Sequence, residues 1–132
     1  MYKRQGAKRA LPLPVSAPFH TELMRPAAAR LAADISATRF DAPAIPVIHN
    51  VHARAETDPV AIKDLMVRQI YSPVRWVDCV AALTARRVEL TVECGAGKVL
   101  CGLNKRIATT LATFATEDDV SLAAALNAAG RC

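Results

Sequence analysis

Aromatic side chains make up only 5% of this sequence, and no apolar run approaches the length needed to cross a membrane. A membrane-spanning helix needs about 20 consecutive apolar residues, so we expect no membrane partner. The first six residues, MYKRQG, carry charge without an apolar stretch behind it, which does not fit a secretory signal. Few aromatics and abundant alanine favour helices with small contact residues over an aromatic-rich β-sandwich. We therefore expect a cytoplasmic protein.

Acidic residues are missing from the beginning of the chain, although the sequence has 12 of them against 17 basic residues. Most of the net charge of +5 comes from four basic residues that precede the first acid, Glu22: Lys3, Arg4, Lys8 and Arg9. Such a basic start is either a solvated end or a contact for an acidic partner. No base-stacking aromatics accompany it, so we expect no nucleic acid partner.

Metal-binding patterns are also scarce. The four cysteines form no C-x-x-C pair and are expected to be reduced thiols: Cys79, Cys94, Cys101 and Cys132. His49 and His52 form an H-x-x-H, but they follow a β-branched run and are expected to flank the end of a strand. We therefore predict no metal site and no cofactor.

Apolar residues supply 52% of the 132 positions, which is enough for the core of one domain. Their spacing alternates between the period of a strand and that of a helix. It predicts strands at 10–16, 47–48, 88–94 and 111–116, and helices at 18–37, 58–70, 72–83, 97–107 and after Glu117. Strands that alternate with helices imply an α/β fold with a mainly parallel sheet.

His20 is the first candidate for chemistry, because it follows a predicted strand and begins a predicted helix. Ligands bind at such positions in open α/β sheets, and the helix dipole would favour a neutral imidazole that can accept a proton. A histidine that is merely hydrogen-bonded at the start of a helix explains the same position.

Gln69 is the second candidate, because its spacing from Ile62 and Met66 places it on the apolar face of a helix. A buried amide needs partners, which suggests that it orients another group. A glutamine at the boundary of the core, reaching solvent, is the alternative.

The segment CGAGKVL, residues 94–100, places two glycines between a strand and a helix. Such a turn lets a ligand approach the backbone, but Val92 and Val99 depart from a Walker A motif and Leu100 from a dinucleotide fingerprint. A tight turn explains the glycines equally well.

No serine in the sequence lies in a G-x-S-x-G elbow, so a histidine base in this chain would lack its nucleophile.

Three ordered blocks closely resemble the bacterial malonyl-CoA:acyl carrier protein transacylases: GAKRALPLPVSAPFH at 6–20, VRQIYSPVRW at 67–76 and ECGAGKVL at 93–100. The resemblance runs from about Gly6 to Gly130 and matches the C-terminal part of a chain more than twice as long. It implies that residues 1–17 contain the basic start and the last strand of a small ferredoxin-like subdomain. Residues 18–132 would form the C-terminal part of a hydrolase-like large subdomain.

The resemblance also implies roles for the two candidates. His20 matches the catalytic histidine, which takes the proton of the serine nucleophile and returns it to the thiol leaving group. Gln69 matches a glutamine whose backbone carbonyl holds the other ring nitrogen of that histidine. The serine and the arginine that binds the malonyl carboxylate have no counterpart here. Ala96 replaces the usual proline of the glycine turn, and Phe19 stands where small residues are common.

The resemblance implies an acyltransferase that moves malonyl from malonyl-CoA to the thiol of acyl carrier protein in fatty acid synthesis. Without the serine, we expect the chain alone to be inactive and its missing N-terminal half to be a possible partner. A non-catalytic domain that binds carrier protein or acts as a scaffold is the alternative, and an RNA-binding module is a third interpretation that the lack of aromatics disfavours.

Overall fold

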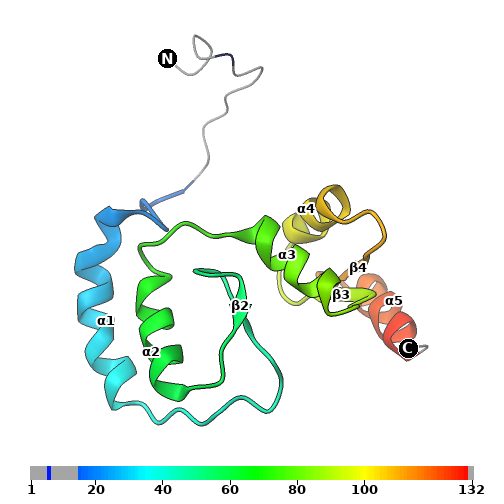
Figure 1. The fold of residues 1–132 in the computed structure, drawn as a ribbon. Helices are drawn as coiled ribbons and strands as arrows, with labels where there is room; N and C mark the ends of the chain where they lie inside the picture. Colours follow the sequence, from blue (N-terminus) through cyan, green and yellow to red (C-terminus); the bar gives the residue numbers. More distant parts are fainter. Residues whose placement is uncertain (1–5, 7–14, 131–132) are drawn as a thin grey trace.

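The computed structural model describes residue 6 and residues 15–130, which form two halves (Figure 1). The first half holds the helices α1 (Arg25–Ala37) and α2 (Pro59–Arg68) and a hairpin of β1 (Ile48–His49) and β2 (Arg54–Ala55). The second half holds α3 (Trp76–Ala85), β3 (Leu90–Glu93), α4 (Val99–Ile107), β4 (Ala112–Ala115) and α5 (Asp119–Ala129). Helices and strands alternate along most of the chain, as the sequence predicts.

The α1 helix begins later than predicted. The sequence places a helix over 18–37, whereas the structure has a single 3-10 turn, η2 (Glu22–Met24), followed by α1 from Arg25. Pro26 explains the difference, because proline cannot donate the backbone hydrogen bond of a helix interior and is tolerated in the first turn. The residues before η2 therefore form turns, with the Phe19 N–H donating to the Ala17 carbonyl at 2.9 Å.

The strand predicted at 47–48 is present one residue later, as β1, and it has a partner that the sequence analysis missed. β1 pairs antiparallel with β2, with Ile48 opposite Ala55 and His49 opposite Arg54. Two-residue strands are too short to show a period of two. The turn between them is closed by the Ala53 N–H, which donates to the His49 carbonyl at 2.8 Å. His49 thus lies within the strand and His52 in the turn.

The start of α3 also differs from the prediction. The sequence predicts that Ser72-Pro73 begins this helix, but α3 begins at Trp76 and no side chain caps it. Instead, the Arg75 N–H donates to the Asn50 carbonyl at 3.1 Å, which ties the start of α3 to the hairpin of the first half. The predicted cap of α2 is confirmed, because the Asp58 carboxylate accepts a hydrogen bond from the Val60 N–H at 3.1 Å.

The parallel pairing predicted for the C-terminal strands is confirmed. β3 and β4 are parallel, with Leu90 opposite Ala112 and Glu93 opposite Ala115. The α4 crossover joins them, and both α4 and α5 contact the pair. The acidic start predicted for the last helix is also present, with Asp118 accepting from the Ser121 N–H at 2.7 Å. The α/β class follows from this arrangement.

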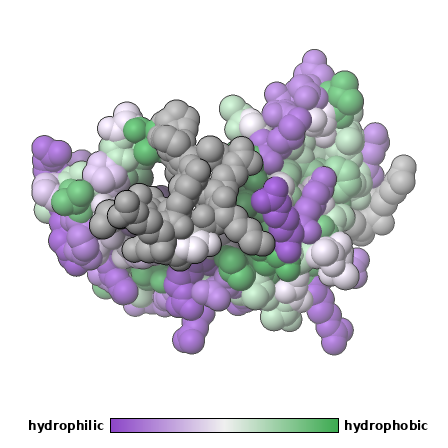
Figure 2. Space-filling view, turned by 90° about the horizontal axis from the view of Figure 1, so that it is seen from above, coloured by the Kyte–Doolittle hydropathy of each residue, from purple (hydrophilic) through white to green (hydrophobic). Residues whose placement is uncertain are grey.

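The core is small, and much apolar surface is left uncovered. Among the described residues, Val80 on α3 is the only large side chain that is fully buried. Exposed apolar side chains occur on most elements, and green areas interrupt the polar surface in Figure 2. Within the described part of the chain, no helix has the length and apolar character to cross a membrane. A parallel strand pair is normally covered on both faces. The exposed apolar side chains therefore form a surface that is suited to further contacts.

Two predictions fall mostly outside the described residues. The predicted strand at 10–16 and the basic start include residues 1–5 and 7–14, for which no structure is described. The division into 1–17 and 18–132 therefore stays a prediction.

Candidate functional site

His20 lies in a turn and not in a helix. Its backbone has φ +60°, in the left-handed region that few residues other than glycine adopt. The turn is held by the Thr21 hydroxyl, which donates to the Pro18 carbonyl at 2.7 Å. The His20 side chain is exposed, and α1 begins five residues further on, at Arg25. The expected effect of a helix dipole on this ring therefore does not apply, because that effect falls off within one turn of a helix end.

Gln69 caps the C-terminal end of α2, where its N–H donates to the Leu65 carbonyl at 2.9 Å. Its own backbone carbonyl lies 2.9 Å from Nδ1 of His20. A carbonyl oxygen only accepts hydrogen bonds, so Nδ1 carries the proton in this contact. Nε2 is then left with a free lone pair and can accept a proton. The structure thus joins the two candidate residues, 49 positions apart, through the main chain of Gln69.

An apolar hollow of about 340 Å³ lies directly beside His20. Apart from His20 and Gln69, all of its lining residues are apolar: Phe19, Met24, Ala27, Leu31 and Ile70. Phe19, which lines this hollow together with His20, is 55% exposed. The hollow offers room and an apolar wall beside His20.

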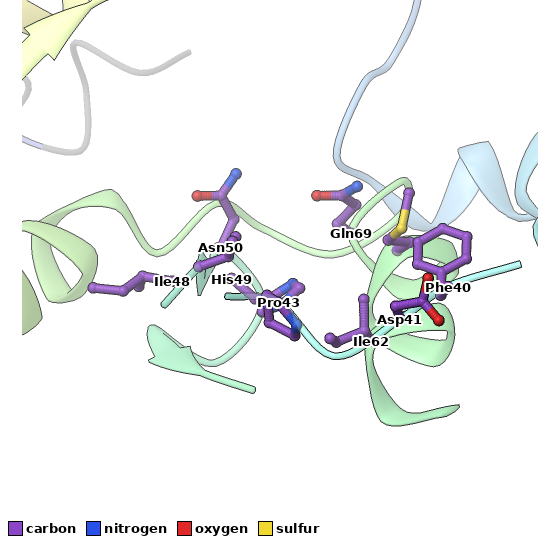
Figure 3. Close-up of a pocket in the computed structure, with 10 residues that line it drawn as sticks. Phe40, Asp41, Pro43, Ile48, His49, Asn50, Ile62 and Gln69 are labelled. Carbon is purple, nitrogen blue, oxygen red and sulfur yellow. The ribbon is translucent and has the colours of Figure 1, made fainter. Parts of the chain in front are cut away.

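A second hollow, also of about 340 Å³, shares Gln69 as a lining residue. It lies between the hairpin and α2, and the side-chain amides of Asn50 and Gln69 extend to the same side of it (Figure 3). Asn50 was missed by the sequence analysis, because it belongs to no motif and follows a two-residue strand. Its position two residues after the β-branched pair Val47-Ile48 was the available signal.

His49, which also lines this hollow, has a buried Nε2 without a hydrogen-bond partner in the structure. Burial lowers the pKa of His49, and the charge of His52 lowers it further, while Glu56 acts in the opposite direction. The ring centroids of His49 and His52 are 5.9 Å apart, and the two ring planes are nearly perpendicular. No group of three potential metal ligands occurs among the described residues.

The glycine turn lies in the other half of the molecule, at the start of α4 (Figure 1). Gly95 and Gly97 have φ of +132° and +87°, so both need a conformation that suits glycine. Two N–H groups in the first turn of α4 are occupied by a side chain of the protein itself, because Glu93 accepts from Leu100 at 3.1 Å and from Cys101 at 2.7 Å. Glu93 at the end of β3 thus caps the helix that follows the glycine turn. The structure does not place the glycine turn next to His20.

No family model matches the chain. Among curated proteins, it is 51% identical over 124 residues to the malonyl CoA-acyl carrier protein transacylase of Salmonella typhimurium and 43% identical over 124 residues to that of Bacillus subtilis. These matches cover 94% of this chain. The chain spans only 40% and 39% of the length of these relatives.

Solved structures agree with these matches. An acyl carrier protein S-malonyltransferase from Vibrio cholerae is 57% identical with a TM-score of 0.86, over 92% of this chain and 40% of its own. The malonyl-CoA:acyl carrier protein transacylase of Xanthomonas oryzae is 41% identical with a TM-score of 0.90, over 96% and 40%. A malonyl-transacylase solved in complex with a type II PKS acyl-carrier protein is 46% identical with a TM-score of 0.89, over 96% of this chain and 41% of its own. In sequence and in fold, the chain belongs to the malonyl-CoA:acyl carrier protein transacylase family, and it matches the C-terminal part of that family's longer chain.

Proposed function

We propose that this chain supplies the acid–base part of an acyl carrier protein S-malonyltransferase. In this proposal His20 is the general base and acid, and the backbone carbonyl of Gln69 is its orienting acceptor. The serine nucleophile would come from the remaining part of the transacylase fold. The observation that carries the proposal is the 2.9 Å contact between His20 Nδ1 and the Gln69 carbonyl, beside an apolar hollow.

The reaction would proceed in two halves. His20 Nε2 takes the serine proton as the serine oxygen attacks the thioester carbonyl of malonyl-CoA. When the tetrahedral intermediate collapses, the carbon–sulfur bond breaks and the imidazolium returns the proton to the thiolate of coenzyme A. In the second half, His20 takes the proton of the carrier-protein thiol as that sulfur attacks the acyl-serine. When this second tetrahedral intermediate collapses, the ester bond to the serine breaks and the imidazolium returns the proton to the serine oxygen.

The neutral acceptor has a consequence for this mechanism. A carboxylate would fix the tautomer of the imidazole and also stabilise the imidazolium through its charge. The Gln69 carbonyl fixes the tautomer by a hydrogen bond and contributes only a dipole. His20 would therefore be oriented for proton transfer without being held as a cation.

The test replaces the matching C-terminal part of the Salmonella typhimurium transacylase with residues 6–130 of this chain. We expect this chimera to transfer malonyl from malonyl-CoA to acyl carrier protein, while the present chain alone does not. In the chimera, His20→Ala should reduce kcat by a factor of about 10³ or more, the scale seen when a paired base is removed. The matched control is His52→Gln, which removes a histidine in the hairpin turn and should leave activity unchanged. An active chimera that is insensitive to His20→Ala would refute the role of His20.

A second function is favoured by the basic start of the sequence. Lys3, Arg4, Lys8 and Arg9 form a cationic segment that suits an acidic carrier protein, and a structural neighbour was solved with such a protein. In this alternative the chain binds carrier protein without turnover. The chain alone should then bind acyl carrier protein in a salt-dependent manner, and replacing the four basic residues with alanine should abolish binding. Absence of binding by the unchanged chain would exclude this alternative.

We also propose a cytoplasmic location. Cys79, Cys94 and Cys101 are free thiols, as is usual for proteins of a reducing compartment.

A further inference from the structure

The segment that carries His20 meets the segment that carries Gln69 in two places. One contact is the hydrogen bond from His20 Nδ1 to the Gln69 carbonyl. The other joins Arg25 and Tyr71, whose guanidinium carbon and ring centroid are 4.1 Å apart. Arg25 follows His20 by five residues, and Tyr71 follows Gln69 by two. The two contacts are therefore parallel connections between the same segments.

Arg25 is itself held in place. The Glu22 carboxylate accepts hydrogen bonds from Arg25 Nε and, at 3.1 Å, from Nη2. This forked contact uses the edge of the planar guanidinium and leaves its face free for the aromatic ring. Arg25 is also the first residue of α1, so its backbone is fixed by the helix that follows.

Tyr71 belongs to the turn that ends α2. Its N–H donates to the Arg68 carbonyl at 3.2 Å, and the N–H of the next residue, Ser72, donates to the same oxygen at 3.0 Å. The Gln69 carbonyl lies within this turn. A ring held against α1 therefore fixes the turn that presents the acceptor of His20.

The hydrogen bond at His20 needs such support. The ring is exposed, and its backbone has the unfavourable φ of +60°, which persists only where surrounding contacts hold it. Because water competes for an exposed hydrogen bond, a small separation of the two segments is enough to release the imidazole. The released ring would exchange freely between its two neutral tautomers.

We propose that Arg25 and Tyr71 are positioning residues, whose stacked pair holds the His20 turn against the Gln69 turn and thereby keeps the proton of His20 on Nδ1. This inference rests on the proposed function only in so far as His20 is the base. The pair does not touch the reacting atoms and acts through the geometry of His20.

The chain contains a matched control at the other end of the same two helices. Lys63 on α2 donates to the Ser36 carbonyl of α1 at 2.8 Å and lies 5.6 Å from the ring centroid of Phe40. This pair also joins α1 to α2 and also combines a cation with a ring. Removing it should loosen helix packing without altering His20.

The first experiment measures the imidazole ¹⁵N chemical shifts of the labelled chain at a pH of about 8, where histidine is mostly neutral. We expect the unchanged chain, Tyr71→Phe and Lys63→Ala to show His20 protonated on Nδ1. Tyr71→Phe keeps the aromatic face, and Lys63→Ala is the helix-packing control. Tyr71→Leu and Arg25→Met should shift His20 toward protonation on Nε2. Arg25 is 57% exposed, so Arg25→Met provides a second variant that is expected to fold if Tyr71→Leu does not.

The second experiment measures kinetics in the chimera described above. Tyr71→Leu and Arg25→Met should lower kcat by a factor of about 10, at the lower end of what a positioned acid–base group contributes, with little change in KM for malonyl-CoA. Tyr71→Phe should have the same kcat as the chimera without substitutions. Lys63→Ala should lower the melting temperature and leave kcat unchanged.

Ring shifts and kcat that stay unchanged in both disrupting variants would overturn the proposal. So would equal effects of Lys63→Ala and Arg25→Met, since these would indicate a general role in stability. Failure of the proposed function has a different signature, namely chimera activity that survives His20→Ala. In that case the ring shifts still decide whether the pair positions His20.

Discussion

Glu93, the last residue of β3, accepts a hydrogen bond from the N–H of Cys101 in the first turn of α4 at 2.7 Å. Burial of this carboxyl alone would raise its pKa, but the hydrogen bonds from Cys101 and Leu100 outweigh it and hold the pKa below 4.5. The side chain thus joins the strand to the helix that crosses over from it. It also satisfies N–H groups that a helix start leaves without intrahelical partners.

The first prediction concerns this carboxylate. Because its folded pKa is depressed, its stabilising contribution is present above the unfolded value of about 4.5 and is lost as the pH falls through the folded value. Glu93→Gln should lower the melting temperature at neutral pH and reduce the loss of stability on acidification. Urea unfolding at several pH values measures both effects. Glu89→Gln, which changes an exposed carboxylate directly before β3, is the control and should do neither.

The second prediction concerns His49. Burial and the charge of His52 lower its folded pKa below 6.5, so the folded state binds the proton less readily than the unfolded state. The free energy of unfolding should therefore be highest above about pH 6.5 and should fall as the pH drops below it. His49→Gln should flatten this dependence in urea unfolding between about pH 7.5 and 5. An unchanged slope would contradict the assignment.

The third prediction uses two glycines that differ in conformation. Gly97 has φ +87°, whereas Gly102 lies within α4, where an added Cβ would meet no atom within 4 Å. Gly97→Ala should destabilise the chain by about 1 kcal/mol, the cost of a left-handed conformation for alanine. Gly102→Ala should stabilise it by about 0.5–1 kcal/mol, because alanine favours a helix interior. Chemical denaturation measures both changes in the free energy of unfolding. Two changes of the same sign would disprove this account.

The fourth prediction tests the small core. Val80 on α3 is fully buried, whereas Val77 on the same helix is 61% exposed. Val80→Ala should cost about 2 kcal/mol, because it removes two buried methyl groups and leaves a cavity. Val77→Ala should change the free energy of unfolding by less than about 0.5 kcal/mol in the chain alone.

The fifth prediction separates the main chain of Gln69 from its side chain. In the chimera, Gln69→Ala keeps the carbonyl that accepts from His20, so it should reduce kcat far less than His20→Ala. A loss as large as that of His20→Ala would show that the amide side chain, which lines the second hollow, takes part directly. Steady-state kinetics of the two variants side by side decides between them.

The sequence was sufficient to predict the elements with strong local signals. The Asp58-Pro59 start of α2, the alternation in β3 and the acidic start of α5 depend on neighbouring residues alone. Periodicity could not locate the start of α1, because apolar spacing does not register that Pro26 is tolerated in the first turn of a helix and disfavoured in its interior. The pattern also missed β2, whose two residues pair only through the turn at Ala53.

The site was less accessible from the sequence. The spacing predicts Gln69 on an apolar helix face and favours a role for its side chain, whereas the resemblance points to its carbonyl. The structure shows that carbonyl next to His20, but the catalytic roles of both residues stay predictions. The Arg25–Tyr71 contact could not be seen in the sequence, because it depends on how α1 and the end of α2 lie against each other.

The His20–Gln69 contact has a consequence for folding. It joins residues 49 positions apart, whereas the paired positions of β3 and β4 are 22 apart, as for Leu90 and Ala112. Loop-closure entropy makes the longer connection about 0.7 kcal/mol harder to form, before the ordering of the helices in between is counted. The β3–α4–β4 unit should therefore assemble first. The hydrogen bond that orients the imidazole should be among the last native contacts to form and the first to open.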